Sequence, residues 1–290
     1  MKILLFGRDG QLGTDLYRAI SEISEVAGYG LDDLDLTEFE KLEATIECEQ
    51  PDLIINAAAY TAVDRAESEA ELAEMVNAVA PGIMASMASE LGAGMIHYST
   101  DYVFDGNADR PYTEADRPRP ESVYGQTKLD GERAVLENCD NALVLRTSWV
   151  YSIHGQNFLR TMLRLAAERD ELSVVADQVG APTTTRALTD ATLKLIQYFM
   201  LHGKFDQNVR GVYHMTCGGE TSWYGFAAAI IKASAYADTR VKKITTADYP
   251  TPAKRPAYSV LSNRKLEETF GISLPDWETA LAACMQEETS

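Results

Sequence analysis

The sequence predicts an α/β protein with a Rossmann-type, doubly wound parallel sheet and a smaller C-terminal lobe. Three observations support this fold class. A short strand rich in Ile and Leu (residues 2–6) runs directly into a glycine-rich turn at residues 7–13. Apolar, strand-like runs then alternate with helical patterns, as they do in βαβ units. Polar or glycine-containing segments follow several of these strands, at the sheet edge where such folds bind ligands.

The first half of the chain supplies the alternating elements. Leu12, Leu16 and Ile20 recur on one stripe of the first helix, and Thr37 is the expected N-cap of the second. After Val150 the pattern loosens into a mixture of short strands and helices. Expected strands cover residues 2–6, 26–30, 51–56, 94–98 and 143–146, and expected helices end at about 20, 49 and 91.

Composition and charge exclude several classes of protein. The chain has 290 residues and a net charge of −18. A nucleic-acid-binding protein usually carries a basic stripe, and this sequence has none. The apolar runs are too short to span a membrane or to form a signal peptide, so we expect a soluble, cytoplasmic protein. The four scattered cysteines form no C-x-x-C pair, so neither a zinc site nor a disulfide framework is expected.

The glycine-rich turn has the pattern of a dinucleotide-binding loop. Gly7, Gly10 and Gly13 lie between the first strand and the first helix. Glycines let the backbone approach a pyrophosphate, and the free N–H groups of the helix N-terminus favour an anion. A plain glycine turn is the alternative. The position of the turn, between a strand and a helix, favours the dinucleotide-binding loop. We therefore expect an NAD(P)-binding Rossmann domain over residues 1–150. Residues 151–290 are expected to form a mainly substrate-binding lobe, parts of which return to the sheet.

The choice between NADH and NADPH stays open at this stage. An acid about twenty residues beyond the glycines would bind the adenosine ribose, and Asp32, Asp33 and Asp35 all lie near that distance. No arginine follows the second strand to hold a 2′-phosphate. Arg8, inside the glycine loop, could do so instead.

Tyr124 and Lys128 form the most informative pair in the chain. They are four residues apart, which places them on one helix face with about 6 Å of axial rise between them. An ammonium group near a phenol lowers the pKa of the phenol, which could then exchange a proton with a carbonyl or alcohol. The hydroxyl of Thr100, at the end of a strand, could orient such a carbonyl. Tyr-x-x-x-Lys alone is a weak signal, and a surface helix is its commonest explanation.

Other polar residues have plainer interpretations. The four histidines show no metal-ligand spacing, and His97 lies within a strand, where we expect a structural role. An acidic stretch is expected to form a solvated helix face; it comprises Asp64, Glu67, Glu69, Glu71 and Glu74.

Several longer stretches, taken together, resemble one enzyme family. It is the dTDP-4-dehydrorhamnose reductases, which are extended short-chain dehydrogenase/reductases, and the resemblance covers nearly the whole chain. The stretches that carry it are Gly7-x-x-Gly-Gln-Leu-Gly13, Asn56-Ala-Ala-Ala59, His97-Tyr-Ser-Thr-Asp-Tyr-Val-Phe104, Tyr124-Gly-x-Thr-Lys128, Arg146-Thr-Ser-Trp-Val-Tyr151, Asp177-Gln178, Gly211-Val-Tyr-His214, Thr251-Pro-Ala-Lys-Arg-Pro256 and Leu274-Pro-Asp-Trp277.

The resemblance implies NAD(P)H-dependent reduction of the C4 keto group of dTDP-4-dehydro-L-rhamnose to dTDP-L-rhamnose, for bacterial surface polysaccharide. Tyr124 would be the general acid, Lys128 would hold the nicotinamide ribose and lower the tyrosine pKa, and Thr100 would bond the reacting oxygen. The implied substrate contacts are Thr100, Asp101, Trp149 and Arg255, the last of these for the diphosphate. The implied cofactor contacts, besides Tyr124 and Lys128, are Gly7, Gly10, Gln11, Leu12, Gly13, Asp35, Leu36, Ala58, Ala59, Tyr60, Thr61 and Ser99.

Three departures from the family pattern bear on these expectations. Gly30-Leu31 stands where the family often has an aspartate, and Tyr258 replaces an asparagine. Some members form homodimers around Mg²⁺, but the corresponding stretch 182–188 has Arg186 and no carboxylate, so that Asp15 is the only candidate ligand. Two alternatives therefore remain: a reductase of another nucleotide-linked keto-sugar, and a non-catalytic NADP-binding regulatory subunit.

Overall fold

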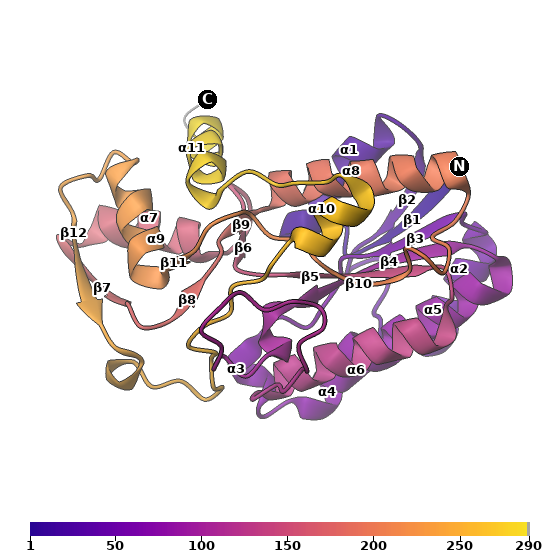
Figure 1. Ribbon diagram of the computed structural model, residues 1–290, viewed down its shortest axis with the longest axis horizontal. Coiled ribbons are helices and arrows are strands. Elements are labelled where there is room, and N and C mark those ends of the chain that lie inside the picture. Colours follow the sequence, from indigo (N-terminus) through magenta and orange to yellow (C-terminus); the bar gives the residue numbers. More distant parts are fainter. Residues whose placement is uncertain (289–290) are drawn as a thin grey trace.

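A parallel sheet of six strands forms the centre of the protein, which confirms the predicted fold class. The computed structural model describes residues 1–288. The strand order is β10-β5-β4-β3-β1-β2, and every neighbouring pair is parallel (Figure 1). The strands are β1 (Lys2–Phe6), β2 (Glu25–Tyr29), β3 (Leu53–Asn56), β4 (Gly94–Thr100), β5 (Ala142–Thr147) and β10 (Gly211–His214).

Helices cover both faces of this sheet because its strands are apolar on both sides. Ile3 and Leu5 of β1 pack with one set of helices, whereas Leu4 and Phe6 pack with the other. Successive side chains of a strand point to opposite faces, so one apolar run serves two cores. One face is covered by α1 (Gln11–Ser21), α8 (Thr185–His202) and α10 (Arg264–Phe270), and the other by α2 (Phe39–Glu49), α5 (Ala80–Leu91) and α6 (Val123–Asn138).

The expected long helix between residues 66 and 91 is interrupted. It consists of α3 (Val63–Ala66), α4 (Ala70–Glu74), a π-helical turn η1 (Met75–Val79) and α5. Within η1, the buried side chain of Asn77 bonds the backbone N–H of Tyr60 and the hydroxyl of Thr127. A π-turn of this kind often marks a functional region. The N-cap expectation at Thr37 is also wrong, since α2 begins two residues later with Glu38 as its N-cap.

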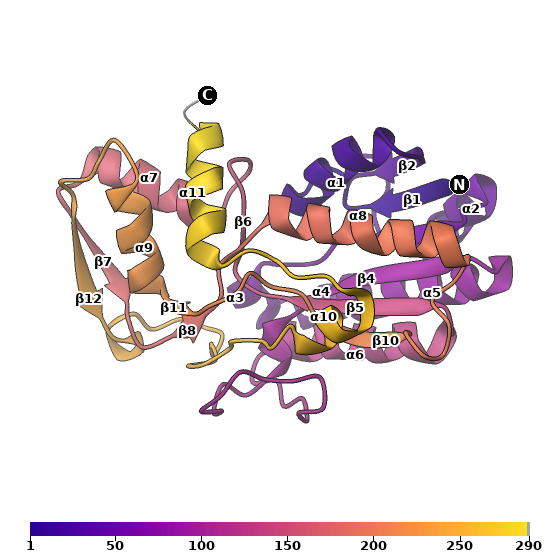
Figure 2. The same ribbon diagram turned by 45° about the horizontal axis from the view of Figure 1, so that its top comes forward.

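The smaller lobe lies beside the carboxyl ends of the sheet strands (Figures 1 and 2). Its core joins three helices to a parallel strand pair. These elements are α7 (Phe158–Glu168), α9 (Trp223–Lys232), α11 (Trp277–Glu288), β7 (Glu171–Val175) and β12 (Arg240–Ile244), with the short strands β6 (Val150–Tyr151), β8 (Val179–Gly180), β9 (Thr183–Thr184) and β11 (Thr221–Ser222), and the 3₁₀ turn η3 (Thr246–Asp248).

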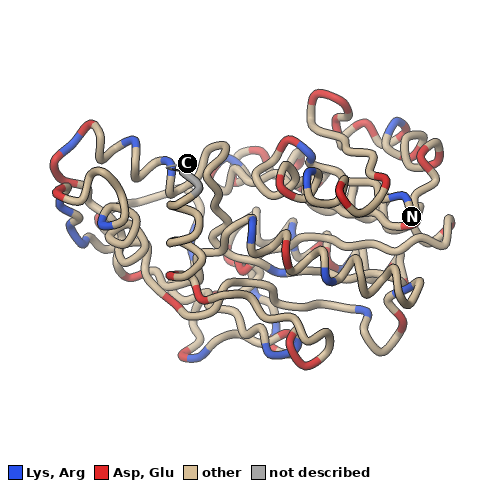
Figure 3. Tube along the Cα trace, turned by 90° about the horizontal axis from the view of Figure 1, so that it is seen from above, with Lys and Arg blue, Asp and Glu red and all other residues tan. Residues whose placement is uncertain are grey.

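The chain after residue 150 does not stay in this lobe. It contributes β10 to the edge of the central sheet and α8 to the cover of one face. The division of the chain at residue 150, into a cofactor-binding domain and a substrate-binding lobe, therefore stays a prediction. No helix within residues 1–288 is long and apolar enough to cross a membrane. Acidic and basic residues alternate along the chain trace in both parts of the molecule (Figure 3).

Candidate active site

The glycine loop forms a tight turn against the end of β3. Gly7 has a φ of +82°, and a Cβ there would lie 2.6 Å from the backbone nitrogen of Ala58. A Cβ at Gly13 would lie 1.9 Å from the carbonyl oxygen of Gly7. Gly10 is the N-cap of α1 and has no side chain to bond the first N–H groups of the helix. Those donors are therefore available to an anion, as a pyrophosphate-binding loop requires.

A cavity of about 480 Å³ begins at this loop and reaches α6. Most of the residues expected to bind a cofactor line it, and they come from four separate strand ends. Gly13 and Tyr60 do not line it: Gly13 lets α1 pack on the loop, and the Tyr60 hydroxyl bonds Glu69. The expected residues that line the cavity are Gly7, Gly10, Gln11, Leu12, Asp35, Leu36, Ala58, Ala59, Thr61, Ser99, Tyr124 and Lys128.

Arg8 lies at the end of β2, where the loop and the acidic segment meet. Its guanidinium donates to the carbonyl oxygen of Gly28 at 2.9 Å and forms ion pairs with Asp9 at 3.1 Å and Asp33 at 2.9 Å. Gly30 leaves room for this arrangement, since a Cβ there would overlap the Asp9 carboxylate. A cation flanked by two carboxylates thus lies beside β2, although Arg8 itself does not line the cavity.

Thr100 lies beside Tyr124, and of these two residues only Tyr124 lines the far end of the cavity. Thr100 ends β4, and Tyr124 lies in the first turn of α6, which is capped by the Ser122 hydroxyl. Gly125 allows the helix to approach the 3₁₀ turn η2 (Asp101–Val103), because a Cβ there would lie 2.2 Å from the Tyr102 carbonyl oxygen. The Thr100 hydroxyl lies close enough to the Tyr124 phenol to lower its pKa.

The expectation that Lys128 lowers the pKa of Tyr124 is wrong in this structure. Burial raises the pKa of Tyr124 to about 12, and the Thr100 hydroxyl offsets only part of that effect. The Lys128 side chain is 2% exposed and its Nζ donates to the carbonyl oxygen of Tyr98 at 2.7 Å. The same burial lowers the pKa of Lys128 to about 8. Tyr124 is therefore a neutral phenol at neutral pH, which suits a proton donor.

A buried ion pair lies directly behind these residues. Arg146 of β5 binds Glu132 of α6 through two hydrogen bonds of 2.8 and 2.6 Å, and the two side chains are 4% and 3% exposed. Ser99 donates to the same carboxylate at 2.6 Å. The Ser99 hydroxyl is thus committed to Glu132, although the residue lines the cavity as expected.

None of the four expected substrate residues lines the cavity itself: Thr100, Asp101, Trp149 and Arg255. Asp101 is buried, and its Oδ1 accepts a hydrogen bond from Thr100 at 3.1 Å, while its Oδ2 has no partner in the described part of the chain. Burial raises the pKa of Asp101 to about 6. Trp149 has a φ of +46° and stacks on Trp223 with ring centroids 3.5 Å apart. An unpaired buried oxygen and a strained backbone are both typical of ligand-binding positions.

Arg255 reaches the site from the far end of the sequence. Its Nη1 and Nη2 donate to the two carboxylate oxygens of Asp64 at 3.1 and 2.8 Å, and Asp64 also accepts from the N–H of Ala253. The expectation that Asp64 belongs to a solvated helix face is therefore wrong. Sequence reasoning missed this pair because the two residues are 191 positions apart. Tyr258, the other departure in this segment, donates to Glu220 at 2.8 Å.

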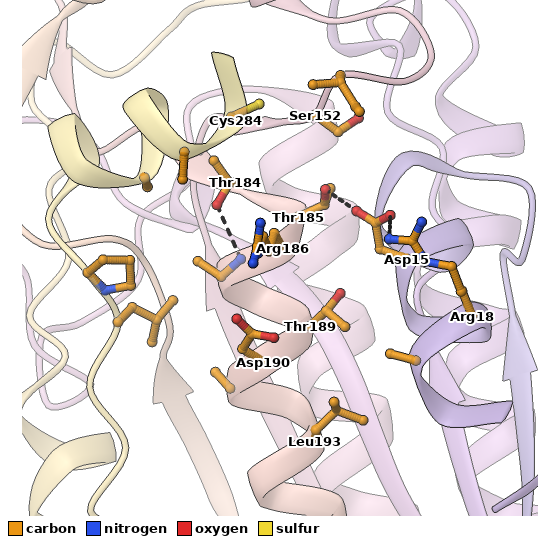
Figure 4. Close-up of a pocket in the computed structure, with 18 of the residues that line it drawn as sticks. Asp15, Arg18, Ser152, Thr184, Thr185, Arg186, Thr189, Asp190, Leu193 and Cys284 are labelled. Carbon is orange, nitrogen blue, oxygen red and sulfur yellow. Dashed lines mark hydrogen bonds and ion pairs between the residues drawn. The ribbon is translucent and has the colours of Figure 1, made fainter. Parts of the chain in front are cut away.

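A second and larger cavity, of about 980 Å³, lies away from these residues between α1, α8 and α11 (Figure 4). Asp15 and Asp190 line it together with Arg18 and Arg186, and Asp15 accepts a hydrogen bond from the Thr185 hydroxyl. Within residues 1–288, no three His, Cys, Asp or Glu side chains are close enough to hold a metal ion. No step is derived through a metal.

The sheet, the glycine loop and the Thr100, Tyr124 and Lys128 side chains define a Rossmann-type short-chain dehydrogenase/reductase. A family model described as RmlD substrate binding domain matches residues 1–290. The chain belongs to this family, that of the dTDP-4-dehydrorhamnose reductases.

Relatives and solved structures agree over the full length. The chain is 46% identical to a dTDP-4-dehydrorhamnose reductase of Burkholderia thailandensis (99% of each chain) and 43% identical to one of Escherichia coli K12 (99% and 98%). A solved dTDP-4-dehydrorhamnose reductase of Clostridium acetobutylicum has a TM-score of 0.93 and 40% identity, covering 100% of each chain. One from Bacillus anthracis, solved in complex with NADP, has a TM-score of 0.90 and 34% identity, covering 99% of each chain.

Proposed function

We propose that this protein reduces the C4 keto group of dTDP-4-dehydro-L-rhamnose to dTDP-L-rhamnose with NADPH or NADH. The observation that carries the proposal is the position of the Tyr124 phenol, which lies beside Thr100 and lines the end of a cavity that starts at the glycine loop. The names of the relatives, at up to 46% identity among those described above, support the same substrate. In this arrangement, one end of the cavity suits a pyrophosphate and the other suits a carbonyl group.

The residues at the end of the cavity perform the proton chemistry. A reduced nicotinamide, when bound, supplies the hydride that attacks the carbonyl carbon. The Thr100 hydroxyl orients the carbonyl oxygen, and Tyr124 donates its phenolic proton to that oxygen as negative charge develops there. A pKa of about 12 keeps Tyr124 protonated until the more basic alkoxide forms. Lys128 holds the ribose beside Tyr124, since the two residues share one face of α6.

Turnover tests this proposal directly. The purified protein, mixed with dTDP-4-dehydro-L-rhamnose and either cofactor, is expected to oxidise the cofactor and form dTDP-L-rhamnose. Absence of turnover with both cofactors contradicts the proposal. Comparison with other nucleotide-linked keto-sugars tests the first alternative, which Tyr258 motivates. Co-purification of a stoichiometric enzyme without reductase activity would support a regulatory subunit, for which Tyr124 has no evident use.

Arg8 is the proposed contact for the 2′-phosphate of NADPH. We expect Arg8→Ala to raise the Kd of NADPH about tenfold and to change that of NADH little, because a charge-assisted contact contributes about 1.5–3 kcal/mol. Fluorescence titration of both cofactors measures the effect. Arg18→Ala is the matched control, since Arg18 lies on α1 but faces the other cavity. Equal weakening of NADH and NADPH would contradict this assignment.

Arg255 is the proposed contact for the diphosphate of the sugar nucleotide. Its guanidinium already holds a carboxylate through both nitrogens, so it is oriented to hold two phosphate oxygens in the same way. We expect Arg255→Lys to raise the KM of the sugar nucleotide about tenfold, with the KM of the cofactor unchanged. The exposed Arg264→Lys serves as the control in the same steady-state assay. An unchanged KM for the sugar nucleotide removes Arg255 from the site.

A further inference from the structure

A continuous row of buried polar groups joins Ala58, just after β3, to Lys128 of α6. The N–H of Ala58 donates to Asn56 Oδ1 at 3.0 Å, and Asn56 Nδ2 lies 3.1 Å from His97 Nδ1. On the other side of the ring, His97 Nε2 lies 3.4 Å from Lys128 Nζ. His97, Asn56 and Lys128 are all buried. The row crosses from β3 through β4 to α6, and the roles assigned above to the active-site residues do not use His97.

The first hydrogen bond in this row determines the positions of the protons in the others. A backbone N–H can only donate, so the Asn56 atom that faces Ala58 must be the carbonyl oxygen. The amide nitrogen of Asn56 therefore faces His97, and it too can only donate. His97 Nδ1 must accept this bond, which leaves the proton of the neutral imidazole on Nε2. That Nε2–H points to the amine of Lys128.

An N–H group facing an amine distinguishes the two protonation states of the lysine. An ammonium group has three donors and no lone pair, so it repels the imidazole N–H. A neutral amine has a lone pair and accepts a hydrogen bond from it. We propose that His97 is a positioning residue that holds Lys128 Nζ beside β4 and favours its neutral form. The proposal deepens the proposed reductase function and, for its catalytic meaning, rests on it.

The surroundings of Lys128 support this assignment. Burial lowers the pKa of Lys128 to about 8, and burial followed by the lysine charge lowers the pKa of His97 well below its usual value. The charge of Glu132 raises the pKa of Lys128 and so opposes the effect of burial, but the Glu132 carboxylate is already bound by Arg146. Other titratable groups around α6 act elsewhere: the charge of Asp101 in η2 acts on Tyr124, the Tyr102 ring packs on Tyr124, and burial followed by the charge of Asp130 raises the pKa of Glu74 in α4.

In the reaction, the His97 contact makes the Lys128 ammonium give up a proton more readily. After Tyr124 has donated its proton, it is a phenolate one helical turn from Lys128. Water in the cavity that both residues line relays the proton: an N–H bond of the ammonium breaks, the O–H bond of Tyr124 forms, and the electron pair stays on Nζ. His97 Nε2–H then donates to that pair, and solvent returns the proton to Nζ before the next cycle. His97 thus lowers the cost of restoring the phenol.

The tautomer of His97 tests the proposal without any need for activity. In the ligand-free protein labelled with ¹⁵N-histidine, the His97 ring signals are those missing from the spectrum of His97→Leu. We expect a neutral ring with a protonated Nε2 and an unprotonated Nδ1. The opposite tautomer, or an imidazolium at neutral pH, would overturn the proposal. This result stands even if the protein proves to act on a different sugar or on none.

The pH profile of the reaction tests the effect on Lys128. If reduction needs the ammonium form, kcat/KM falls as pH rises through the lysine pKa. Removal of the facing N–H in His97→Leu is expected to raise that pKa and to move the alkaline limb up by about one pH unit. His214→Leu is the matched control, because His214 is equally buried but its ring bonds the carbonyl oxygen of Tyr112. A kcat/KM that is lower at every pH, with the alkaline limb at its original pH, would indicate a merely structural role and overturn the proposal. If His97→Leu does not fold, the tautomer of His97 in the wild-type protein decides, with its ring signals assigned by sequential NMR.

Discussion

Replacement of Tyr124 by Phe is expected to lower kcat by a factor on the order of 10²–10⁴, the usual contribution of a positioned general acid. The ring is retained, so its edge-on contact with Tyr102, with centroids 5.5 Å apart, is kept. What is lost is the proton for the sugar oxygen and the interaction of the phenol with the Thr100 hydroxyl. Steady-state assays with the keto-sugar measure the loss, and fluorescence titration should show that cofactor binding survives.

Tyr102→Phe is the control for this substitution. Tyr102 lies next to Tyr124 and is also buried enough to have a raised phenol pKa, but it makes no hydrogen bond to Thr100 through its hydroxyl. We expect this variant to keep most of its rate. If Tyr124→Phe also kept its rate, the proton donor would have to be another group, and the proposed mechanism would fail.

Removal of Glu132 is expected to have the largest effect on stability. Glu132→Ala leaves Arg146 charged in the interior without its carboxylate, and Ser99 loses its acceptor. Such a loss costs about 3–5 kcal/mol because a buried charge is left uncompensated. Urea unfolding of the variant, followed by circular dichroism, should show a midpoint shift that corresponds to this difference.

Two further variants test whether this loss of stability is particular to the buried Glu132–Arg146 ion pair. Glu268→Ala breaks the exposed pair with Arg264 and is expected to change stability by less than about 1 kcal/mol. The double variant Glu132→Leu with Arg146→Met removes both charges and should recover most of the loss. A small effect of Glu132→Ala, similar to that of Glu268→Ala, would mean that water reaches Arg146.

The parts of the protein that the sequence predicted well depend on local signals. The apolar run at residues 2–6, the three glycines after it and the strand that ends at Thr100 are each readable within about ten residues. Parallel strands then bring their carboxyl ends to one edge, so that Thr100, Gly7 and Ala58 meet without further information. Most of the expected cofactor residues line one cavity, and their role in binding stays a prediction.

The parts that could not be predicted depend on contacts between distant segments. No spacing rule joins Asp64 to Arg255, and none directs the Lys128 ammonium to the Tyr98 carbonyl instead of the Tyr124 phenol. The expectation for the tyrosine pKa was wrong because helical spacing describes proximity along α6 but not burial. The π-helical turn at residues 75–79 has the same origin, since the buried Asn77 side chain bonds partners on other segments.

The return of β10 to the central sheet affects how the chain folds during its synthesis on the ribosome. This strand forms the edge beside β5, and its residues are Gly211–His214. One face of the sheet is covered by α8, and its core also includes Leu266 and Ile272. During synthesis, β5 therefore stays an open edge until more than 210 residues have left the ribosome, and the apolar face stays incomplete for longer still. Every residue of the catalytic group is translated by position 128, yet the framework that holds it is among the last parts to be delivered.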